Sequence, residues 1–172
     1  IKPRTINKKL NFKFLTLNII TFYYVFFIFC KYSYEIHKSE GPTFFFYLIS
    51  ICFFTDIGGY VFGKIIGGKK LSKISPNKTI SGTIGSFILS IVPLIWIINF
   101  NYLDLEFNLN NIMFCLLISL ISQLGDLFIS FIKRKAKIKD TGNLLPGHGG
   151  VIDRVDGIIF AVPFSYFLLK LF

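Results

Sequence analysis

The sequence predicts an all-α, polytopic integral membrane protein with about five transmembrane helices. Of its 172 residues, 53% are hydrophobic and only 16% are charged, whereas soluble domains carry about 25% charged residues. Five apolar stretches approach the roughly 20 residues that a helix needs to cross the hydrocarbon core of a bilayer. They cover residues 14–30, 43–62, 80–99, 111–132 and 157–171.

The first and the last of these stretches need separate arguments. Residues 14–30 follow a basic segment, as the core of a signal peptide would, but Lys31, Tyr32 and Tyr34 come next, where small residues would mark a cleavage site. The last stretch is short but can extend back toward Ile152. All five are apolar on most faces and lack the polar stripe of a surface helix, so we interpret them as retained spans rather than as buried helices of a soluble fold.

The basic residues predict the orientation of the chain. The formal net charge is +10, and sixteen of the nineteen Lys and Arg residues lie in the N-terminal tail, in residues 63–79 and in residues 133–156. Basic loops stay on the cytoplasmic side of a membrane, which places these three segments there and the short C-terminal tail outside. A chain this apolar differs from a typical soluble nucleic-acid-binding protein and is too hydrophobic to be disordered.

Four aspartates lie where a bilayer disfavours a lone charge: Asp56 and Asp126 within the second and fourth stretches, Asp153 and Asp156 at the start of the last. An ionised carboxylate at the bilayer centre costs at least about 2.5–3.5 kcal/mol, so such groups face water or the protein interior. Asp56 and Asp126 lie about seven residues, or roughly 10 Å, before the cytoplasmic end of their spans. We therefore expect all four to converge near the cytoplasmic interface. The alternative for each is an interhelical hydrogen bond or an ion pair with a loop lysine.

Carboxylates beside basic loops indicate a particular chemistry. Oxygen ligands next to phosphate-binding cations are the parts of a Mg²⁺-dependent phosphoryl or nucleotidyl transfer site. Helical spacing gathers the candidates on two faces, which hold Ser122, Asp126, Ser130 and Lys133 on the fourth stretch and Asp56, Gly59, Tyr60 and Gly63 on the second. Gly59, Gly63 and Gly67 recur every four residues, which allows two helices to approach closely; for Gly59 and Gly63 we favour this packing role over a functional one.

The two basic connections carry further candidates. Pro76 predicts a turn before hydroxyl residues that can cap the third span. In the second connection, glycines and Pro146 surround His148, so backbone amides there can bind an anion. Two alternatives stay open, because His148 can simply complete a turn hydrogen bond and the charged run can bind anionic lipid at the membrane surface.

The stretch from Ser130 to Asp156 resembles the diagnostic motif of phosphatidate cytidylyltransferases, also called CDP-diacylglycerol synthases. The matching residues are Ser130, Lys133-Arg134, Lys139-Asp140, Pro146-Gly147-His148-Gly149-Gly150 and Asp153-Arg154-Val155-Asp156. Two further blocks are similar to the family, Asp56 to Gly63 and Ser75 to Thr79 with Gly82. The resemblance covers roughly residues 50–170. Because the family usually has more spans before this region, the chain resembles its C-terminal half or a short form.

The resemblance implies the reaction of CTP with phosphatidate to give CDP-diacylglycerol and diphosphate, a step of phospholipid biosynthesis. It implies Mg²⁺, with or without a second cation, and a multi-pass protein of the bacterial inner membrane whose active site is cytoplasmic. CTP, phosphatidate and membrane lipid are then the partners, without nucleic acid and with a homodimer compatible. Residues 1–40 form a basic tail with the first span, and residues 41–172 form the catalytic membrane domain.

The resemblance also implies roles for individual residues. Asp126 and Asp153 bind metal, with Asp156 and Asp56 as weaker or indirect ligands. The other catalytic candidates are Lys133, Arg134 and His148, and the substrate-binding candidates are Ser75, Lys78, Lys139, Asp140, Gly149, Gly150 and Arg154.

Three positions depart from the family's pattern. Ile129 and Ser81 replace residues that are commonly acidic, and Gly157 replaces a common serine. The loss of two acids predicts weaker metal binding or weaker pairing with the basic loops, but Asp126 and Asp153 are present. The alternative functions are a related CTP-dependent lipid kinase, a synthase acting on an ether-lipid phosphate, and a non-catalytic membrane protein that binds anionic lipid.

Overall fold

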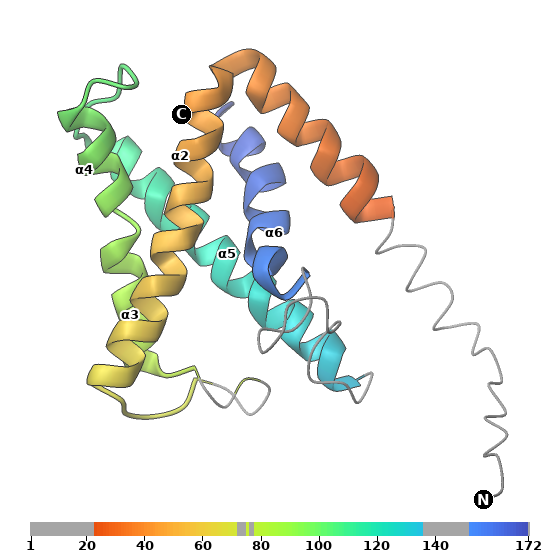
Figure 1. Cartoon of the computed structure of the whole chain (residues 1–172), viewed down its shortest axis with the longest axis vertical. Coiled ribbons are helices and arrows are strands. Elements are labelled where there is room, and N and C mark those ends of the chain that lie inside the picture. The colour runs from red at the N-terminus through yellow and green to blue at the C-terminus, as the bar shows by residue number, and fades with distance from the viewer. Residues whose placement is uncertain (1–22, 72–74, 76–77, 136–151, 172) are drawn as a thin grey trace, which may run out of the picture.

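A computed structural model of the whole chain describes residues 23–71, 75, 78–135 and 152–171. Within these ranges all regular elements are helices (Figure 1). They are η1 (Tyr24–Phe29, a π-helix), α2 (Cys30–Ile65), α3 (Ile80–Leu89), α4 (Val92–Asn99), α5 (Leu109–Lys135) and α6 (Ile152–Leu168). In the same ranges the extended pairing is limited to a bridge between Lys70 and Thr79. The predicted all-α class is confirmed.

The length and composition of the helices agree with a membrane protein. Among the described residues, three helical segments are long and apolar enough to cross a bilayer, Phe27–Ile65, Ile80–Asn99 and Leu109–Lys135, and Val155–Leu168 is a shorter apolar helix. Large apolar side chains also point outward, Phe46, Phe53 and Trp96 among them, in a way that soluble monomers rarely show. The count of about five spans stays a prediction, and most of the first stretch, residues 14–22, lies outside the described residues.

Residues 31–41, which separate the first two predicted spans, do not form the expected connecting loop. We expected residues 31–41 to form a loop, but α2 continues through them and changes direction sharply at Gly41 (Figure 1). Gly41 has φ 82° and ψ 175°, a region open almost only to glycine, and Pro42 removes the backbone donor that would continue the helix. The kink at Gly41 and Pro42 therefore changes the direction of the chain where a loop was expected.

The helices alternate in direction, so their connections gather at two ends. The end of α2, the start of α3, the end of α5 and the start of α6 lie at the lower end in Figure 1. The Gly41 kink, the 100–108 segment and the end of α6 lie at the other. The described parts of the two basic connections therefore share one end of the molecule, as the charge pattern predicts.

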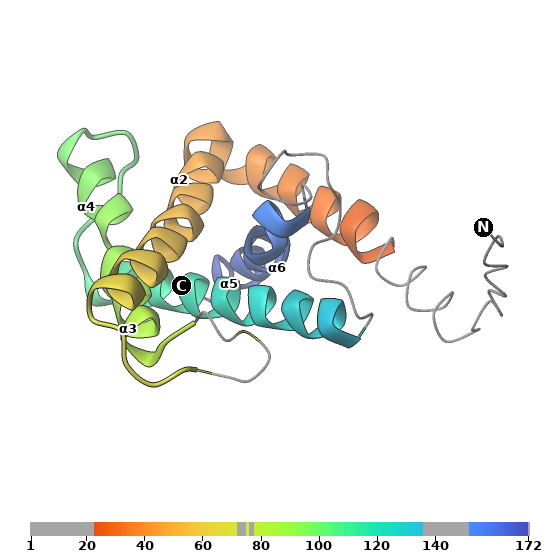
Figure 2. The same cartoon turned by 60° about the horizontal axis from the view of Figure 1, so that its bottom comes forward.

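The hydrophobic core joins α2 to α4, α5 and α6. Ile51, Leu94, Ile118 and Val162, from α2, α4, α5 and α6, are almost completely buried. α6 contacts α2, α5 and η1, and in Figure 2 it lies between α5 and the segment before the kink. This packing fixes α6 against α5 near the start of α6.

α2 and α3 approach through glycines. A Cβ on Gly82 would lie 2.6 Å from the carbonyl oxygen of Gly59, and a Cβ on Gly58 would overlap the backbone of Gly85. A Cβ on Gly63 would lie 3.0 Å from the Thr79 hydroxyl oxygen. The packing role predicted for Gly59 and Gly63 is confirmed, whereas Gly67 lies beyond the helix with φ 64°.

Candidate active site

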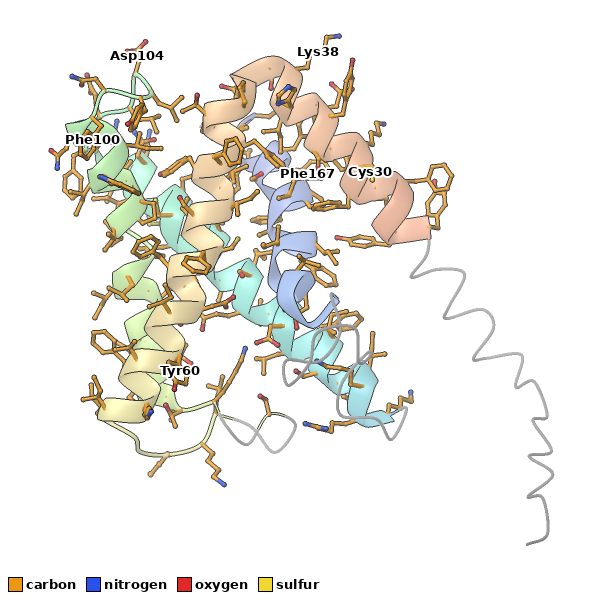
Figure 3. The ribbon with its side chains drawn as sticks, viewed as in Figure 1. Cys30, Lys38, Tyr60, Phe100, Asp104 and Phe167 are labelled. Atoms are coloured by element: carbon orange, nitrogen blue, oxygen red, sulfur yellow. The ribbon has the colours of Figure 1, made fainter. Side chains whose placement is uncertain are left out.

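A cavity of ≈ 350 Å³ lies between α2, α3, α5 and α6. Tyr60, one of its lining residues, lies toward the end that holds the basic connections, away from Lys38 and Asp104 (Figure 3). The lining residues are Thr55, Asp56, Gly59, Tyr60, Ser75, Lys78, Thr79, Gly82, Thr83, Ser86, Gln123, Asp126 and Asp156. Polar side chains thus surround a hollow within helices that are otherwise apolar.

The start of α3 holds the loop side of the cavity. Thr79 caps the helix, since its hydroxyl accepts a hydrogen bond from the Gly82 amide at 3.1 Å, which confirms the predicted hydroxyl cap. The Leu71 amide donates to the Lys78 carbonyl at 2.8 Å, and the Lys78 amide donates to the Ser75 carbonyl at 3.2 Å. These bonds fix the backbone of Lys78 at the cavity edge.

Asp126 is the best-connected carboxylate of the site. One oxygen, Oδ2, forms an ion pair with the Lys78 ammonium, and the other, Oδ1, accepts a hydrogen bond from Ser130 at 3.3 Å. The side chains of Lys78 and Asp126 are 29% and 26% exposed, so the pair is partly shielded from water. An ion pair with a loop lysine was the alternative to a ligand role, and for Asp126 the structure contains that pair.

The other carboxylates face Asp126 from two sides. Asp156 is buried, and its Oδ1 accepts a hydrogen bond from the Gly157 amide at 2.9 Å. Both Asp156 and Asp56 lie close enough to Asp126 for charge repulsion, while Lys78 attracts Asp56 and Lys133 attracts Asp156. The site therefore brings three carboxylates together near two lysines.

Two glycines allow α6 to pack closely against α5. A Cβ on Gly157 would overlap the Ser122 hydroxyl, and a Cβ on Gly125 would lie 2.7 Å from the Phe160 ring. The serine expected by the family pattern at residue 157 would therefore not fit here without a shift of α5 or α6. The departure at Gly157 matches the local packing.

The cavity gathers five of the residues predicted from the sequence: Asp56, Ser75, Lys78, Asp126 and Asp156. Lys133 and Arg134 are described in the last turn of α5 and do not line it; Lys133 faces Asp156, and Arg134 is exposed. Asp153 and Arg154 lie in the first turn of α6, where only the backbone is described. The remaining candidates lie outside the described residues: Lys139, Asp140, His148, Gly149 and Gly150.

Sequence reasoning missed several lining residues. Thr83 and Ser86 lie about one turn apart on α3, and Gln123 lies about one turn before Asp126 on α5. The spacing of these polar residues is a signal that could have found them. Ser86 also has a structural role, since its hydroxyl donates to the Thr55 carbonyl at 2.7 Å and joins α3 to α2.

The oxygen atoms that line the cavity suit a hard divalent cation as ligands. All its potential ligands are carboxylate, hydroxyl or amide oxygens, which Mg²⁺ prefers over nitrogen or sulfur. In the described ranges no three His, Cys, Asp or Glu side chains form a group able to hold a metal ion. Mg²⁺ is commonly bound by one or two carboxylates together with substrate phosphates, so these residues fit a metal that is shared with a phosphate ligand.

Comparison with known proteins identifies the family of the chain. Residues 3–172 match the profile described as the cytidylyltransferase family. The chain belongs to this family. The resemblance seen in the motif from Ser130 to Asp156 is thereby confirmed.

Curated relatives of this family member are bacterial phosphatidate cytidylyltransferases. The protein of that name from Bacillus subtilis (strain 168) is 38% identical over 98% of this chain and 64% of its own length. Those from Staphylococcus haemolyticus (strain JCSC1435) and Staphylococcus aureus (strain COL) are 40% and 42% identical, each over 77% of this chain and 51% of its own length. The chain thus spans between about half and two thirds of the relatives that it matches.

Proposed function

We propose that this chain carries the catalytic region of a phosphatidate cytidylyltransferase, which converts CTP and phosphatidate to CDP-diacylglycerol and diphosphate. The observation that carries the proposal is the cavity in which Asp56, Asp126 and Asp156 meet Lys78 at the basic end of apolar helices. The name of the relatives supports the choice of substrate.

The reaction requires two anionic substrates to approach each other. An oxygen of the phosphatidate phosphate attacks the α-phosphorus of CTP, and the bond from that phosphorus to diphosphate breaks. Negative charge grows on the bridging oxygen as diphosphate leaves, so positive groups placed there stabilise the transition state. We propose that Lys78, which lines the cavity, and Lys133, which attracts Asp156, supply this positive charge.

The remaining roles follow the family motif. We propose that Asp126 and Asp153 hold Mg²⁺, supported by Asp156 and Asp56, with or without a second cation. When bound, Mg²⁺ would neutralise phosphate charge and polarise the reacting phosphoryl group. Arg134, Lys139 and Arg154 would bind phosphates beside Ser75 and Asp140, and His148 with Gly149 and Gly150 would shape the nucleotide loop.

We further propose that the site faces the cytoplasm from a bacterial inner membrane. CTP is water-soluble and phosphatidate is a lipid, so the reacting atoms must meet at the interface between the two phases. Sixteen of the nineteen basic residues lie in the segments assigned to that side, which supports this orientation. Membrane lipid is then a partner and nucleic acid is not, and a homodimer is compatible with the proposal.

Product analysis tests the proposed reaction. The purified protein, reconstituted with phosphatidate, Mg²⁺ and CTP labelled at the α-phosphate, should transfer the label to a lipid that co-migrates with CDP-diacylglycerol. Label from the γ-phosphate on a lipid alcohol would instead identify a kinase. A strong preference for an ether-lipid phosphate would identify the other synthase, and lipid binding without any product would overturn the enzymatic proposal.

A further inference from the structure

The ion pair between Lys78 and Asp126 occupies the atoms that the proposed reaction needs. Lys78 engages Oδ2 of Asp126 while Ser130 engages Oδ1, so both carboxylate oxygens already have partners. A divalent cation that approaches Oδ2 is repelled by the positive charge of the ammonium, so it binds there more tightly when the ammonium moves away. Cation binding at Asp126 and the position of Lys78 are therefore coupled.

The surroundings favour Lys78 as an exchangeable counter-ion. Its backbone is held by Leu71 and Ser75, but its ammonium sits on a flexible four-carbon stem with three donors that suit carboxylate and phosphate alike. Asp56 attracts the same ammonium from α2. Without this positive charge, Asp126 would face the carboxylates of Asp56 and Asp156 with less positive charge to offset them.

We propose that Lys78 is an internal counter-ion that holds Asp126 until a substrate phosphate draws its ammonium away, so that divalent cation and phosphate bind cooperatively. The proposal rests on the proposed function for the identity of the phosphate and deepens it. Phosphate binding moves the ammonium from Oδ2 and opens that oxygen to the cation. By linkage, the cation then raises the affinity for phosphate by the same factor.

The proposal makes a counter-intuitive prediction for cation binding in the absence of substrate. Removing the ammonium with Lys78→Met should tighten the binding of a divalent cation by roughly tenfold, the scale of one charged hydrogen bond. The same substitution should weaken phosphate binding. A residue that only supported the fold would weaken both.

The experiment measures Mn²⁺ binding by electron paramagnetic resonance on the full chain in detergent micelles, without nucleotide. Lys70→Met is the matched control, because Lys70 lies beside Thr79 in the same loop, is exposed and carries the same charge. We expect tightening for Lys78→Met, a change within about twofold for Lys70→Met, and loss of the site with Asp126→Asn. Equal affinities for the two lysine variants would overturn the proposal.

Two additions cover the other outcomes. If Lys78→Met does not fold, Lys78→Arg keeps an ion pair and should bind Mn²⁺ no more tightly than the original protein; tighter binding would sink the idea. Micelles containing phosphatidate should tighten Mn²⁺ binding more than phosphatidylcholine micelles do, by an increment that disappears in Lys78→Met. Because none of these measurements requires turnover, an inactive protein with the expected affinities would refute the proposed function alone, and an active protein without them would refute this inference alone.

Discussion

Asp126 has a different partner on each carboxylate oxygen, so a substitution that keeps its shape isolates its charge. In Asp126→Asn, Ser130 can still donate to the side-chain oxygen, while Lys78 loses its anionic partner. Because exposed and partly exposed ion pairs contribute about 1 kcal/mol or less, we expect little change in thermal stability. If Asp126 holds Mg²⁺ as proposed, the rate of CDP-diacylglycerol formation should fall roughly a hundredfold or more, since the cation that neutralises phosphate charge is lost.

The measurement pairs an initial rate with a thermal unfolding curve on the same preparation. Ser130→Ala is the control, since it removes the other partner of Asp126 and leaves the charge in place; its rate should fall far less. If Asp126→Asn were as active as the original protein, the site would be elsewhere.

Asp56, Asp126 and Asp156 could be predicted because an aspartate within or beside an apolar stretch stands out, whereas Ser75 and Lys78 were predicted from the resemblance to the family. Thr83, Ser86 and Gln123 do not stand out, since single hydroxyl and amide groups are readily accommodated within helices. The pairing of Lys78 with Asp126 could not be predicted in detail either. It depends on how the loop before α3 lies against α5, which the spacing of residues along either segment does not determine.

At the scale of elements, the site depends on how closely α2 and α3 approach. Gly82→Ala places a methyl group 2.6 Å from the Gly59 carbonyl oxygen, so the helices must separate. Overpacking of this kind costs about 1–3 kcal/mol. Because Asp56 lies on α2 and Lys78 directly before α3, the separation should also reduce activity.

Thermal unfolding and initial rates of Gly82→Ala check this prediction against Ile88→Ala. Ile88 lies on the same helix and is 53% exposed, so it tests the effect of a substitution in α3 away from the glycine contact. An alanine at residue 82 that is as stable as the Ile88 variant would mean that α2 and α3 do not pack as described.

The hydropathy pattern does not show where a helix ends between two apolar stretches. The boundaries of the spans follow from hydropathy, but a helix can continue through polar residues when nothing breaks it. Residues 31–40 are helical for this reason, and the chain changes direction only at Gly41 and Pro42. The division into residues 1–40 and 41–172 stays a prediction, although the kink falls at that boundary.

At the scale of the whole molecule, charge and topology agree for a simple physical reason. Each span crosses the membrane, so successive connections lie on opposite sides. Because basic loops stay on the cytoplasmic side, the basic charge of the connections alternates as well. The structure places the described parts of both basic connections at one end, with the candidate site near them (Figures 1 and 3). Charge counting could therefore predict where the site lies along the membrane normal, but not which side chains form it.

The same agreement predicts the sidedness of the two ends in a living bacterium. Asp104 lies in the exposed connection opposite Tyr60 (Figure 3), and Lys70 lies in the basic connection. In a Cys30→Ser background, chosen because Cys30 is exposed while Cys52 and Cys115 are buried, a cysteine is introduced by Asp104→Cys or by Lys70→Cys. A maleimide that cannot cross the inner membrane should label only the first in cells with a permeabilised outer membrane, because basic loops are retained in the cytoplasm. Both should react after lysis, and labelling of the Lys70→Cys protein before lysis would contradict the predicted orientation and the proposed cytoplasmic site.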